Sequence, residues 1–405
     1  MTVPDVAPPV SQDGLPHYDV IVLGAGPGGS TAALRLAQHG VRVLLVDRER
    51  FPRSKPCGGG VLVAAAARLS FSLHAVSQRV VYGFRVTYKR DAGFAHTYPE
   101  PLAIMTRRRD LDTFLADQAA TAGATFADGR AVSAIHRNGA GMIVDFHDGE
   151  RAVAAALVAA DGANGVSRRA LDMPVLDRAV ALEANSPGLP RHAPDHVSLD
   201  LGSLPGGYGW LFPKDGHTNI GVGGWPVVGP QLKTHLAAYA ASEGLSPAQL
   251  EDVRGYTLPL RRFDEPLTRG PVVFVGDAAG LIDPLSGEGI HNAFYSAQLA
   301  ADEIARYLSG DVPDLRGYEH AVRRQIDPEL AVARQLQALF HQRPWPYVRL
   351  LRHSGRFWRS FCRTVRGEAT YVGFKGRLGP AASLVDVAAA FAARGVAQRS
   401  GWSHP

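Results

Sequence analysis

A cysteine stands directly before three consecutive glycines in the segment Phe51 to Val61, which reads FPRSKPCGGGV. Successive glycines weaken helices and strands, so a triplet marks backbone that turns sharply or lies close against a flat surface. Beside such a surface Cys57 could donate a proton, act as a redox partner, or serve only as a small apolar contact. Lys55 could favour the thiolate, contact a phosphate, or be solvated, which is its commoner state.

The residues before this segment have the pattern of a nucleotide-binding unit. A buried strand is predicted from Tyr18 to Leu23, a helix from Gly28 to His39, and a second strand from Val41 to Val46. This βαβ arrangement carries the glycine fingerprint of a dinucleotide site. By itself the fingerprint does not separate NAD from FAD.

Each polar or flexible position of the fingerprint has a physical role. Gly24 permits a tight turn, Gly26 lets a pyrophosphate approach the backbone, and Gly29 packs the helix against the strand. Asp47 ends the second strand, where a carboxylate can accept hydrogen bonds from a ribose hydroxyl. We also count the next residue, Arg48, among the cofactor contacts.

A later motif favours a flavin. In PVVFVGDAAGLIDPLSGEGIHNA a buried strand from Val272 to Val275 is followed by Asp277, which can hold a ribityl hydroxyl. A helix is predicted from about Gly289. The amides of Gly287, Gly289 and Ile290 at its start can stabilise negative charge on a reduced isoalloxazine.

A third motif lies between these two, in the stretch ALVAADGANGVSRRAL. Asp161 follows a short strand and is assigned to the cofactor site, with Arg168 behind it. In order, the three motifs resemble the fingerprints of FAD enzymes built like p-hydroxybenzoate hydroxylase, over Tyr18 to about Ile304. Gly165 replaces the serine usual in the third motif, at a position expected to be peripheral.

The glycine triplet narrows the resemblance. FPRxKxCGGG and the stretch YGWLFPKDGHTNIGVG, from Tyr208 to Gly223, resemble the geranylgeranyl reductase family of flavoproteins. The resemblance implies that Cys57, Gly58 and Gly59 lie beside the isoalloxazine ring. The helix entry RRRDLDTF is similar to another motif of that family, which makes Arg108 the flavin-contacting arginine, with Leu111 in place of a phenylalanine. Val132 is included as a further cofactor contact.

Tyr208, Trp210 and Phe212 alternate with apolar residues, which is the period of a strand, so the three aromatic side chains should share one face. That face could line an apolar substrate channel or be an ordinary hydrophobic sheet face. Asp215 and Gly216 predict the turn of a hairpin. We assign catalytic roles to Cys57, Tyr208 and Trp210, and we assign no metal ligands.

The order of these patterns predicts an α/β fold in which a Rossmann-like FAD-binding domain is assembled from separated pieces. A mixed or antiparallel sheet should bind substrate, and the C-terminal region should be helical. The expected ranges are 1–16 for a disordered leader, 17–80, 100–172 and 266–310 for the FAD-binding domain, 81–99 and 173–265 for the substrate sheet, and 311–400 for the helices. Residues 401–405 resemble the start of an affinity tag.

Charge is concentrated in one segment. The formal net charge is +5, and residues 330–367 hold eight arginines and no acid, so the rest carries 5 − 8 = −3. Six of these arginines, from Arg349 to Arg366, recur every three or four residues and predict one basic helical face, although Gly355 weakens the helix. This helix could touch an anionic membrane, or pack its aromatic side onto the protein, which we favour. Cys362, on the same helix, is expected to be structural.

Composition excludes several classes. The chain of 405 residues has two cysteines, no secretory signal pattern and no apolar run long enough to span a bilayer, which predicts a protein of the reducing cytoplasm. Any membrane association would be peripheral, through the basic helix. No nucleic-acid-binding module is recognised.

The expected function is therefore an FAD-dependent reductase of double bonds in a hydrophobic prenylated substrate. NAD(P)H or a reduced ferredoxin-type carrier protein would supply electrons. No second dinucleotide fingerprint is present, so NAD(P)H would bind transiently without a domain of its own. Two alternatives stay open. One is a monooxygenase or halogenase of the same fold, since flavin halogenases carry a lysine near Lys55. The other is a prenyl-binding escort protein that is not an enzyme.

Overall fold

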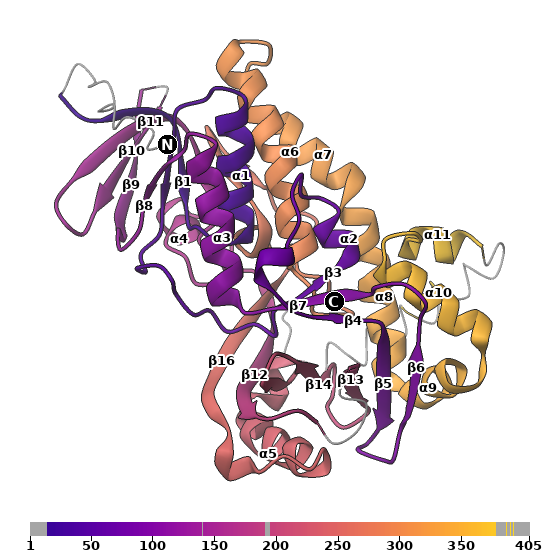
Figure 1. Ribbon diagram of the computed structural model, residues 1–405. Helices are drawn as coiled ribbons and strands as arrows, with labels where there is room; N and C mark the ends of the chain where they lie inside the picture. Colours follow the sequence, from indigo (N-terminus) through magenta and orange to yellow (C-terminus); the bar gives the residue numbers. More distant parts are fainter. Residues whose placement is uncertain are drawn as a thin grey trace.

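The computed structural model describes residues 14–139, 141–190, 195–377, 386, 389 and 392. The expected leader, apart from residues 14–16, lies outside these residues, as does the segment 401–405. Two sheets dominate the architecture, and a chain of helices crosses from one to the other (Figure 1). The expected fold class is confirmed.

The first lobe is built on an eight-stranded sheet. At its centre, β1 pairs in parallel with β11 on one side and with β2 on the other. The near-continuous apolar run of β1 is buried on both faces. Figure 1 shows α1, α3 and α6 side by side on one face, away from the β9–β10 hairpin. The strands are β17 (Thr268–Arg269), β18 (Val272–Phe274), β11 (Arg151–Ala159), β1 (His17–Leu23), β2 (Val43–Val46), β8 (Thr125–Ala127), β9 (Val132–Asn138) and β10 (Gly141–Phe146).

The helices of this lobe follow from simple signals. α1 begins at Pro27, whose missing N–H costs nothing in a first turn, and α6 ends at Ser309, before Gly310, which adopts a φ of +82°. Both pack small residues against the sheet, so the backbones approach closely. The helices are α1 (Pro27–Gln38), α2 (Val63–Ala66), α3 (Arg108–Thr121), α4 (Ser167–Ala170), α6 (Ile290–Ser309) and α7 (Arg316–Gln325).

The second lobe is a seven-stranded mixed sheet in which only the β13–β5 pair is parallel. Every one of its strands falls within the ranges expected for the substrate sheet. Leu211 and Ile220 on one face pack against α5 (Leu232–Ser242), so the alternate residues of the same strands face the first lobe. The strands are β16 (Glu251–Leu260), β12 (Asp177–Pro187), β15 (His217–Gly224), β14 (Tyr208–Pro213), β13 (Val197–Leu201), β5 (Gly83–Tyr88) and β6 (Phe94–Thr97).

A small antiparallel sheet connects the lobes. It orders β3 (Gly60–Leu62), β7 (Ala103–Thr106) and β4 (Ser77–Val81), so the strand that follows the glycine triplet is anchored beside the strand that leads into α3. Short 3₁₀ turns occupy His74–Val76, Pro226–Gln231, Pro247–Gln249 and Gly276–Ala279.

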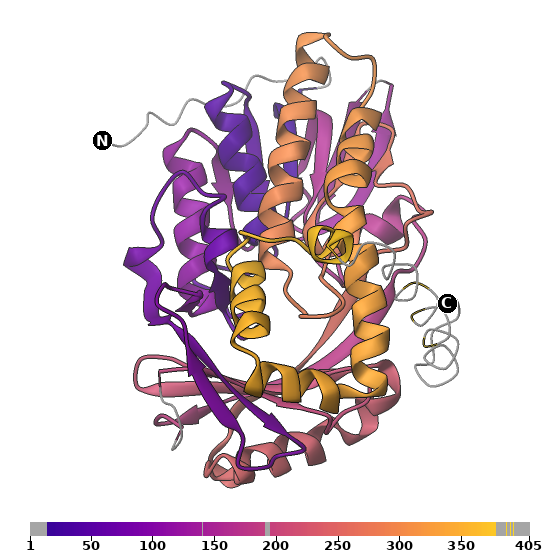
Figure 2. The ribbon, with the colours of Figure 1, turned by 90° about the vertical axis from the view of Figure 1, so that its right-hand side faces the viewer.

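The C-terminal helices run from α8 (Asp327–Gln342) across the second lobe and back towards the first (Figure 2). The expected single basic helix is wrong: the chain forms α9 (Pro344–His353) and α10 (Gly355–Val365), followed by α11 (Tyr371–Gly376). The break falls at Ser354, which has an extended conformation and accepts a hydrogen bond from the Phe357 amide as the N-cap of α10.

The favoured packing of this region is confirmed. Trp358 and Cys362 are buried with Phe84 of β5, while five of the six arginines face outward. Arg366 instead pairs with Glu100 and Glu368 and donates to the Pro101 carbonyl oxygen. Among the described residues, no helix is long and apolar enough to cross a membrane.

Candidate functional site

The β1–α1 turn has the shape that its glycines predict. A Cβ on Gly24 (φ +96°) would lie 2.5 Å from the Ala160 carbonyl oxygen, and a Cβ on Gly29 would lie 1.8 Å from the Gly24 carbonyl oxygen. At Gly26, by contrast, a Cβ would meet only the guanidinium groups of Arg53 and Arg108, at 3.7 and 3.9 Å. An uncapped helix start beside two cations fits the pyrophosphate of FAD.

The Asp47 side chain closes the β1–α1 turn. Its Oδ2 accepts from the Ala25 amide at 2.9 Å and lies 3.3 Å from Arg53, while Oδ1 accepts from the Glu49 amide at 3.0 Å. A carboxylate has about four acceptor positions, so a ribose contact remains compatible with these bonds. That contact stays a prediction. Arg48 points into solvent and pairs with Glu49, so the structure does not bring it to the turn.

Arg108 opens α3 and is almost fully buried. It forms a two-pronged ion pair with Asp112, at 2.8 and 2.7 Å, and Arg53 joins the same carboxylate at 2.8 Å. Burial by itself would lower the pKa of Arg108, but Asp112 and Cys57 outweigh it, and the pKa is raised. The guanidinium therefore stays charged between the pyrophosphate turn and the cysteine. Leu111 beside it is part of the core.

Asp161 shapes its own loop. Its two oxygens accept from the Ser167 amide at 2.8 Å and from the Ser167 hydroxyl at 2.6 Å. A Cβ on Gly165 would lie 2.0 Å from this carboxyl group, so the expectation that position 165 is peripheral is wrong. The cofactor contact of Asp161 stays a prediction. Arg168 ties this loop to the next motif through the Ala278 carbonyl oxygen at 3.1 Å.

Asp277 holds three parts of the chain together. Its Oδ2 accepts from Tyr256 at 2.7 Å and from Lys55 at 3.2 Å, and its Oδ1 lies beside Gly289. Burial would lower the pKa of Lys55, but Asp277 and Tyr256 outweigh it and raise it to about 12. The solvated Lys55 that we favoured is therefore wrong, because the ammonium is mostly buried against a carboxylate. Asp277 keeps one oxygen free of this pair for a ribityl hydroxyl.

The loop before α6 differs from expectation in its amides. The Gly287 amide donates to the Asp283 carbonyl oxygen at 2.8 Å, and the His291 amide donates to the Glu288 carboxyl group at 2.8 Å. One of the three amides assigned to the reduced flavin, that of Gly287, is therefore engaged within the loop. Burial raises the pKa of Glu288 to about 7, because its carboxylate would be poorly solvated, and the neighbouring Asp283 adds to this rise.

Two tyrosines hold this loop from outside. Tyr208 of β14 donates to the Ser286 carbonyl oxygen, and Tyr371 of α11 donates to Asp283 Oδ2 at 3.0 Å. The second lobe and the C-terminal helices thus both fix the loop before α6. Tyr371 was not predicted, since a tyrosine near the end of a helical region carries no local signal of a contact this distant.

The glycine triplet lies against the aromatic strand of the second lobe. A Cβ on Gly58 would lie 2.6 Å from the Phe212 ring and 3.2 Å from Trp210 Nε1, and a Cβ on Gly60 would lie 3.2 Å from Phe212. The flat surface expected beside the triplet is therefore, at least in part, an aromatic ring of the protein. Tyr208, Trp210 and Phe212 do share one face, and it meets the first lobe here.

Cys57 is half-buried at this junction. Its amide donates to Glu183 Oε1 of β12 at 2.7 Å, and the Gly59 amide donates to its sulfur at 3.4 Å. Its side chain also packs on the apolar cluster under α3. Burial raises the pKa of Glu183, which the Cys57 amide and Asn219 oppose. A thiol, a carboxyl group and aromatic rings therefore meet at one point.

Sequence reasoning missed two further groups at this point. Glu183 interrupts an apolar strand, ALEANS, and that interruption was its available signal. Lys214 directly precedes the turn predicted at Asp215 and Gly216, yet its ammonium is buried and donates to the Gly58 and Thr106 carbonyl oxygens at 2.6 and 2.7 Å. The turn predicted at Asp215 and Gly216 was correct, but a turn signal does not indicate where the side chain of the preceding residue, Lys214, points.

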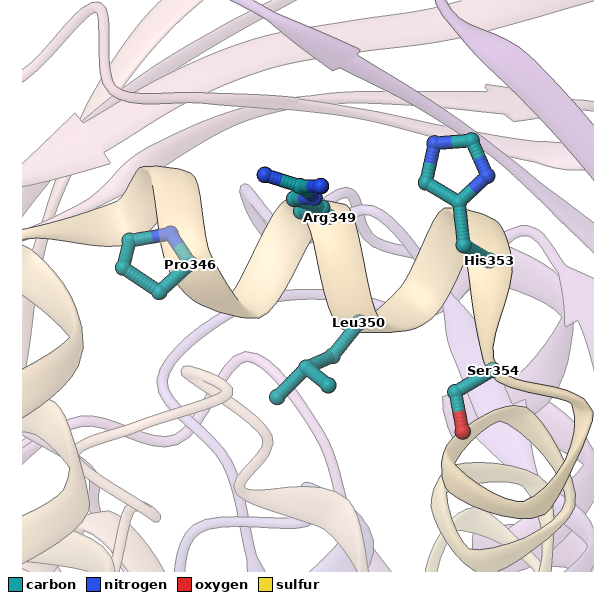
Figure 3. Close-up of a pocket in the computed structure, with 5 residues that line it drawn as sticks. All are labelled: Pro346, Arg349, Leu350, His353 and Ser354. Atoms are coloured by element: carbon teal, nitrogen blue, oxygen red, sulfur yellow. The ribbon is translucent and has the colours of Figure 1, made fainter.

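Val132 begins β9 in the first lobe, and its cofactor contact stays a prediction. Two surface hollows lie away from the Cys57 segment. One of about 360 Å³ is lined by Tyr256, Lys233 and neighbouring residues, and another of about 400 Å³ lies along α9 (Figure 3). Neither includes the aromatic face of β14.

Within the described residues, no cluster of three or more acidic, histidine or cysteine side chains is placed to hold a metal ion.

Comparison with known proteins assigns the family. Residues 17–195 match the family model described as FAD binding domain. The menaquinone reductase of Mycolicibacterium smegmatis is 30% identical over 73% of this chain and 78% of its own length. The geranylgeranyl diphosphate reductase of Rhodobacter capsulatus is 28% identical over 80% and 84%. This chain belongs to the geranylgeranyl reductase family of FAD-dependent oxidoreductases.

Solved structures agree with this family in fold. A geranylgeranyl bacteriochlorophyll reductase-like protein from Thermoplasma acidophilum is 25% identical with a TM-score of 0.70, covering 78% of this chain and 86% of its own. The flavin-dependent brominase Bmp2 has a TM-score of 0.75 at 20% identity, covering 94% and 100%, which shows the shared fold alone. The geranylgeranyl reductase family member described here is thus an FAD-dependent enzyme.

Proposed function

We propose that this enzyme reduces carbon–carbon double bonds in the isoprenoid chain of a hydrophobic prenylated molecule. The observation that carries the proposal is the junction of the Cys57 segment with the aromatic face of β14, where a thiol-bearing segment and an aromatic surface lie together. The names of the relatives, a geranylgeranyl diphosphate reductase and a menaquinone reductase, point to the same substrate class. When bound and reduced, FAD supplies the hydride.

The residues of this chain would supply the proton and stabilise the charge that forms on the substrate. An isolated alkene is a poor hydride acceptor, so a proton must reach one carbon early and leave partial positive charge on the other. The faces of Tyr208 and Trp210 can stabilise that charge. Cys57 is our candidate for the proton donor, and Glu183 fixes its backbone. Arg108 beside the sulfur keeps a positive charge next to it.

The first experiment is anaerobic. The purified holoenzyme is reduced with dithionite, geranylgeranyl diphosphate or menaquinone is added, and flavin reoxidation is followed together with mass spectrometry of the lipid. Reoxidation with a gain of two hydrogens per double bond supports the proposal. If reoxidation requires air and the lipid gains oxygen or a halogen, the proposal is wrong.

The same assay tests Cys57. Cys57→Ala and Cys57→Ser should slow single-turnover reduction, while Cys362→Ala, a change at the buried cysteine of α10, serves as the matched control. An unchanged rate in both Cys57 variants would remove this residue from the proton transfer.

Halogenation or oxygenation is the alternative, and the structure gives one argument against it. The lysine that the comparison with halogenases would use, Lys55, is tied to Asp277 and lies over the Tyr256 ring. An escort protein without chemistry is disfavoured by the family and by the intact pyrophosphate turn. A purified protein that stays colourless with added FAD would revive it.

The electron donor is a separate proposal. NAD(P)H would bind transiently, or a ferredoxin-type carrier protein would dock, since the pyrophosphate turn of β1 is the one recognised for FAD. Anaerobic mixing of the oxidised holoenzyme with NADPH, NADH or reduced ferredoxin distinguishes them by the rate of flavin bleaching. Bleaching by ferredoxin alone would exclude the nicotinamide donors.

We also propose that α9 and α10 rest on an anionic membrane surface. Arg349, Arg352, Arg356 and Arg359 are exposed, and Trp345 and Leu350 expose apolar surface beside them. Figure 3 shows Leu350 and Arg349 on different sides of α9. Each arginine near an anionic surface contributes roughly 1 kcal/mol of attraction.

Vesicle flotation tests this contact. The holoenzyme should float with vesicles of phosphatidylcholine and phosphatidylglycerol and remain behind with phosphatidylcholine alone. The variant Arg352→Ser/Arg356→Ser should lose binding. The control Arg109→Ser/Arg169→Ser removes the same charge from exposed positions elsewhere. Equal loss in both variants would show that net charge, not this surface, is responsible.

A further inference from the structure

Tyr371 of α11 joins the C-terminal helices to the loop that leads into α6. Its hydroxyl donates to Asp283 Oδ2 at 3.0 Å, and the two residues are 88 positions apart in the sequence. Both side chains are half-buried, so water reaches this bond only in part. The alkene reduction proposed above makes no use of it, although it ends in the segment where flavin contacts were expected.

Asp283 shapes the loop before α6 through its backbone and one carboxylate oxygen. Oδ1 accepts from the Leu285 amide at 2.8 Å and from the Ser286 amide at 3.2 Å. The Asp283 amide donates to the Glu288 carbonyl oxygen, and the Gly287 amide donates to the Asp283 carbonyl oxygen, both at 2.8 Å. These bonds close the loop on one residue. A movement of Asp283 would therefore change the path of the chain into α6.

The other carboxylate oxygen of Asp283, Oδ2, faces the C-terminal helices and accepts from Tyr371. Burial raises the pKa of Asp283, and the bonds from Ser286, Leu285 and Tyr371 oppose that rise. Hydrogen bonds to an ionised group are stronger than bonds between neutral groups. Loss of the Tyr371 hydroxyl would leave this oxygen short of a donor, so the loop would shift towards another one.

α8 determines where the Tyr371 ring lies. Glu329 of α8 accepts from the Tyr371 amide at 2.7 Å through Oε2 and from the Val372 amide at 3.3 Å through Oε1. The Thr370 hydroxyl caps the same turn by accepting from the Gly373 amide at 2.9 Å. Figure 1 shows α11 beside α8. The bond to Asp283 is therefore supported by a long helix and not by the short α11 alone.

The loop ends at the N-terminus of α6, where Gly289 is the N-cap and Ile290 is the first helical residue. The amides of these two residues are assigned to the reduced flavin, and a helix N-terminus carries partial positive charge. Oxidised isoalloxazine is neutral, whereas the reduced ring can carry a negative charge. A helix start held near the ring would therefore stabilise reduced FAD more than oxidised FAD.

We propose that Tyr371 is a positioning residue for the cofactor, whose bond to Asp283 holds the start of α6 where it favours reduced FAD over oxidised FAD. Tyr371 acts through the loop and does not contact the substrate. The C-terminal helices thereby influence how readily the flavin accepts electrons. This role goes beyond the reduction of an isoprenoid, because it applies to any substrate of the reduced flavin.

The first test measures the midpoint potential of FAD in the holoenzyme, by anaerobic titration against a reference dye at pH 8. Tyr371→Phe should shift the preference towards oxidised FAD by about threefold to tenfold, which lowers a two-electron potential by about 15–30 mV. Tyr347→Phe removes a hydroxyl from α9 in the same helical region, and this matched control should keep the wild-type potential.

A bond that only braces the fold gives a different result. Tyr371→Phe would then weaken the binding of both forms of FAD equally, and the potential would not change. That outcome would overturn the inference, as would an equal shift in the Tyr347→Phe control.

A second pair of variants tests the connection through α11. Glu329→Ala removes the acceptor of the Tyr371 and Val372 amides and leaves the loop before α6 unaltered. It should lower the potential of the wild-type holoenzyme but not that of Tyr371→Phe, because both changes act on the same bond. Additive shifts would contradict this connection.

The inference and the proposed function fail in different ways, because the potential is measured without substrate. FAD content and melting temperature identify variants that misfold, and Glu329→Ala carries the test if Tyr371→Phe does not retain FAD. The expected shift in potential without reduction of any isoprenoid would overturn the proposed function alone. Reduction of an isoprenoid by a Tyr371→Phe enzyme with the wild-type potential would overturn the role of Tyr371 alone.

Discussion

Gly58 lies directly against the Phe212 ring of the second lobe, and its replacement by alanine tests the central geometry of the site. The added Cβ would lie 2.6 Å from Cδ2 and Cε2 of the Phe212 ring, well inside normal contact. The ring cannot retreat easily, because Phe212 belongs to a strand paired on both sides. The expected consequence is strain between the Cys57 segment and β14.

The magnitude follows from the size of the overlap. Inserting one carbon into a packed position costs about 1–3 kcal/mol. Unfolding entropy of about 2.1 cal/mol/K per residue, over 405 residues, is roughly 0.85 kcal/mol/K. Gly58→Ala should therefore lower the melting temperature of the holoenzyme by about 1–4 °C. It should also weaken FAD binding, because the strain displaces backbone expected beside the flavin.

The assay is differential scanning fluorimetry and FAD titration of three variants. Gly229→Ala is the matched control, since a Cβ there meets no atom within 4 Å. Gly58→Ala/Phe212→Val removes the two ring atoms that clash, so it should be more stable than the sum of the single changes predicts. If Gly58→Ala melts with wild-type and the Gly229→Ala control, the aromatic strand does not lie on the triplet and the site described here is wrong.

Three further changes test the polar contacts. Tyr256→Phe removes the donor 2.7 Å from Asp277 Oδ2, so the pKa of Asp277 should rise and FAD should bind about 5-fold more weakly by titration, unless Asp277 does not contact the cofactor. Burial raises the pKa of Asp283, and the hydrogen bond from Tyr371 opposes that rise. Tyr371→Phe should therefore lower the free energy of unfolding by about 1–2 kcal/mol at pH 8, and by less at pH 5, where the Asp283 carboxyl group is closer to neutral. Equal losses at both pH values in denaturation experiments would contradict this. The pKa of Lys214 is about 7 in the folded chain against 10.5 for an ordinary lysine, so between these values the unfolded chain binds more protons and stability rises with pH. Lys214→Met should remove a slope of about 1.4 kcal/mol per pH unit from that window, and parallel stability curves for variant and wild type would refute the shift.

Local signals were sufficient for the first lobe. Gly24, Gly26 and Gly29 occur where a turn, an open approach and a helix contact each require the absence of a side chain, and Asp47 lies where the second strand must end. Such requirements act over a few residues, so they are visible in the chain itself. The alternation of Tyr208, Trp210 and Phe212 likewise predicted their common face.

Contacts between distant segments were not visible in this way. Lys55 looked like a solvated lysine until Asp277, 222 residues later, was placed beside it. The single basic helix was expected because spacing continues through Gly355, whereas Ser354 caps a new helix so that Trp358 can pack on Phe84. In each case burial against a remote partner outweighed a local preference.

The amino-acid sequence by itself determined the dinucleotide fold, the family and the positions of the glycines, because these depend on backbone conformation within short segments. Only the tertiary structure decided what surrounds Cys57. Glu183, Arg108 and Lys214 come from three different parts of the chain, and their side chains meet around Cys57 and Gly58 because the second sheet is folded onto the glycine triplet. Charge in a buried site depends on three-dimensional distance, which the order of residues along the chain does not contain.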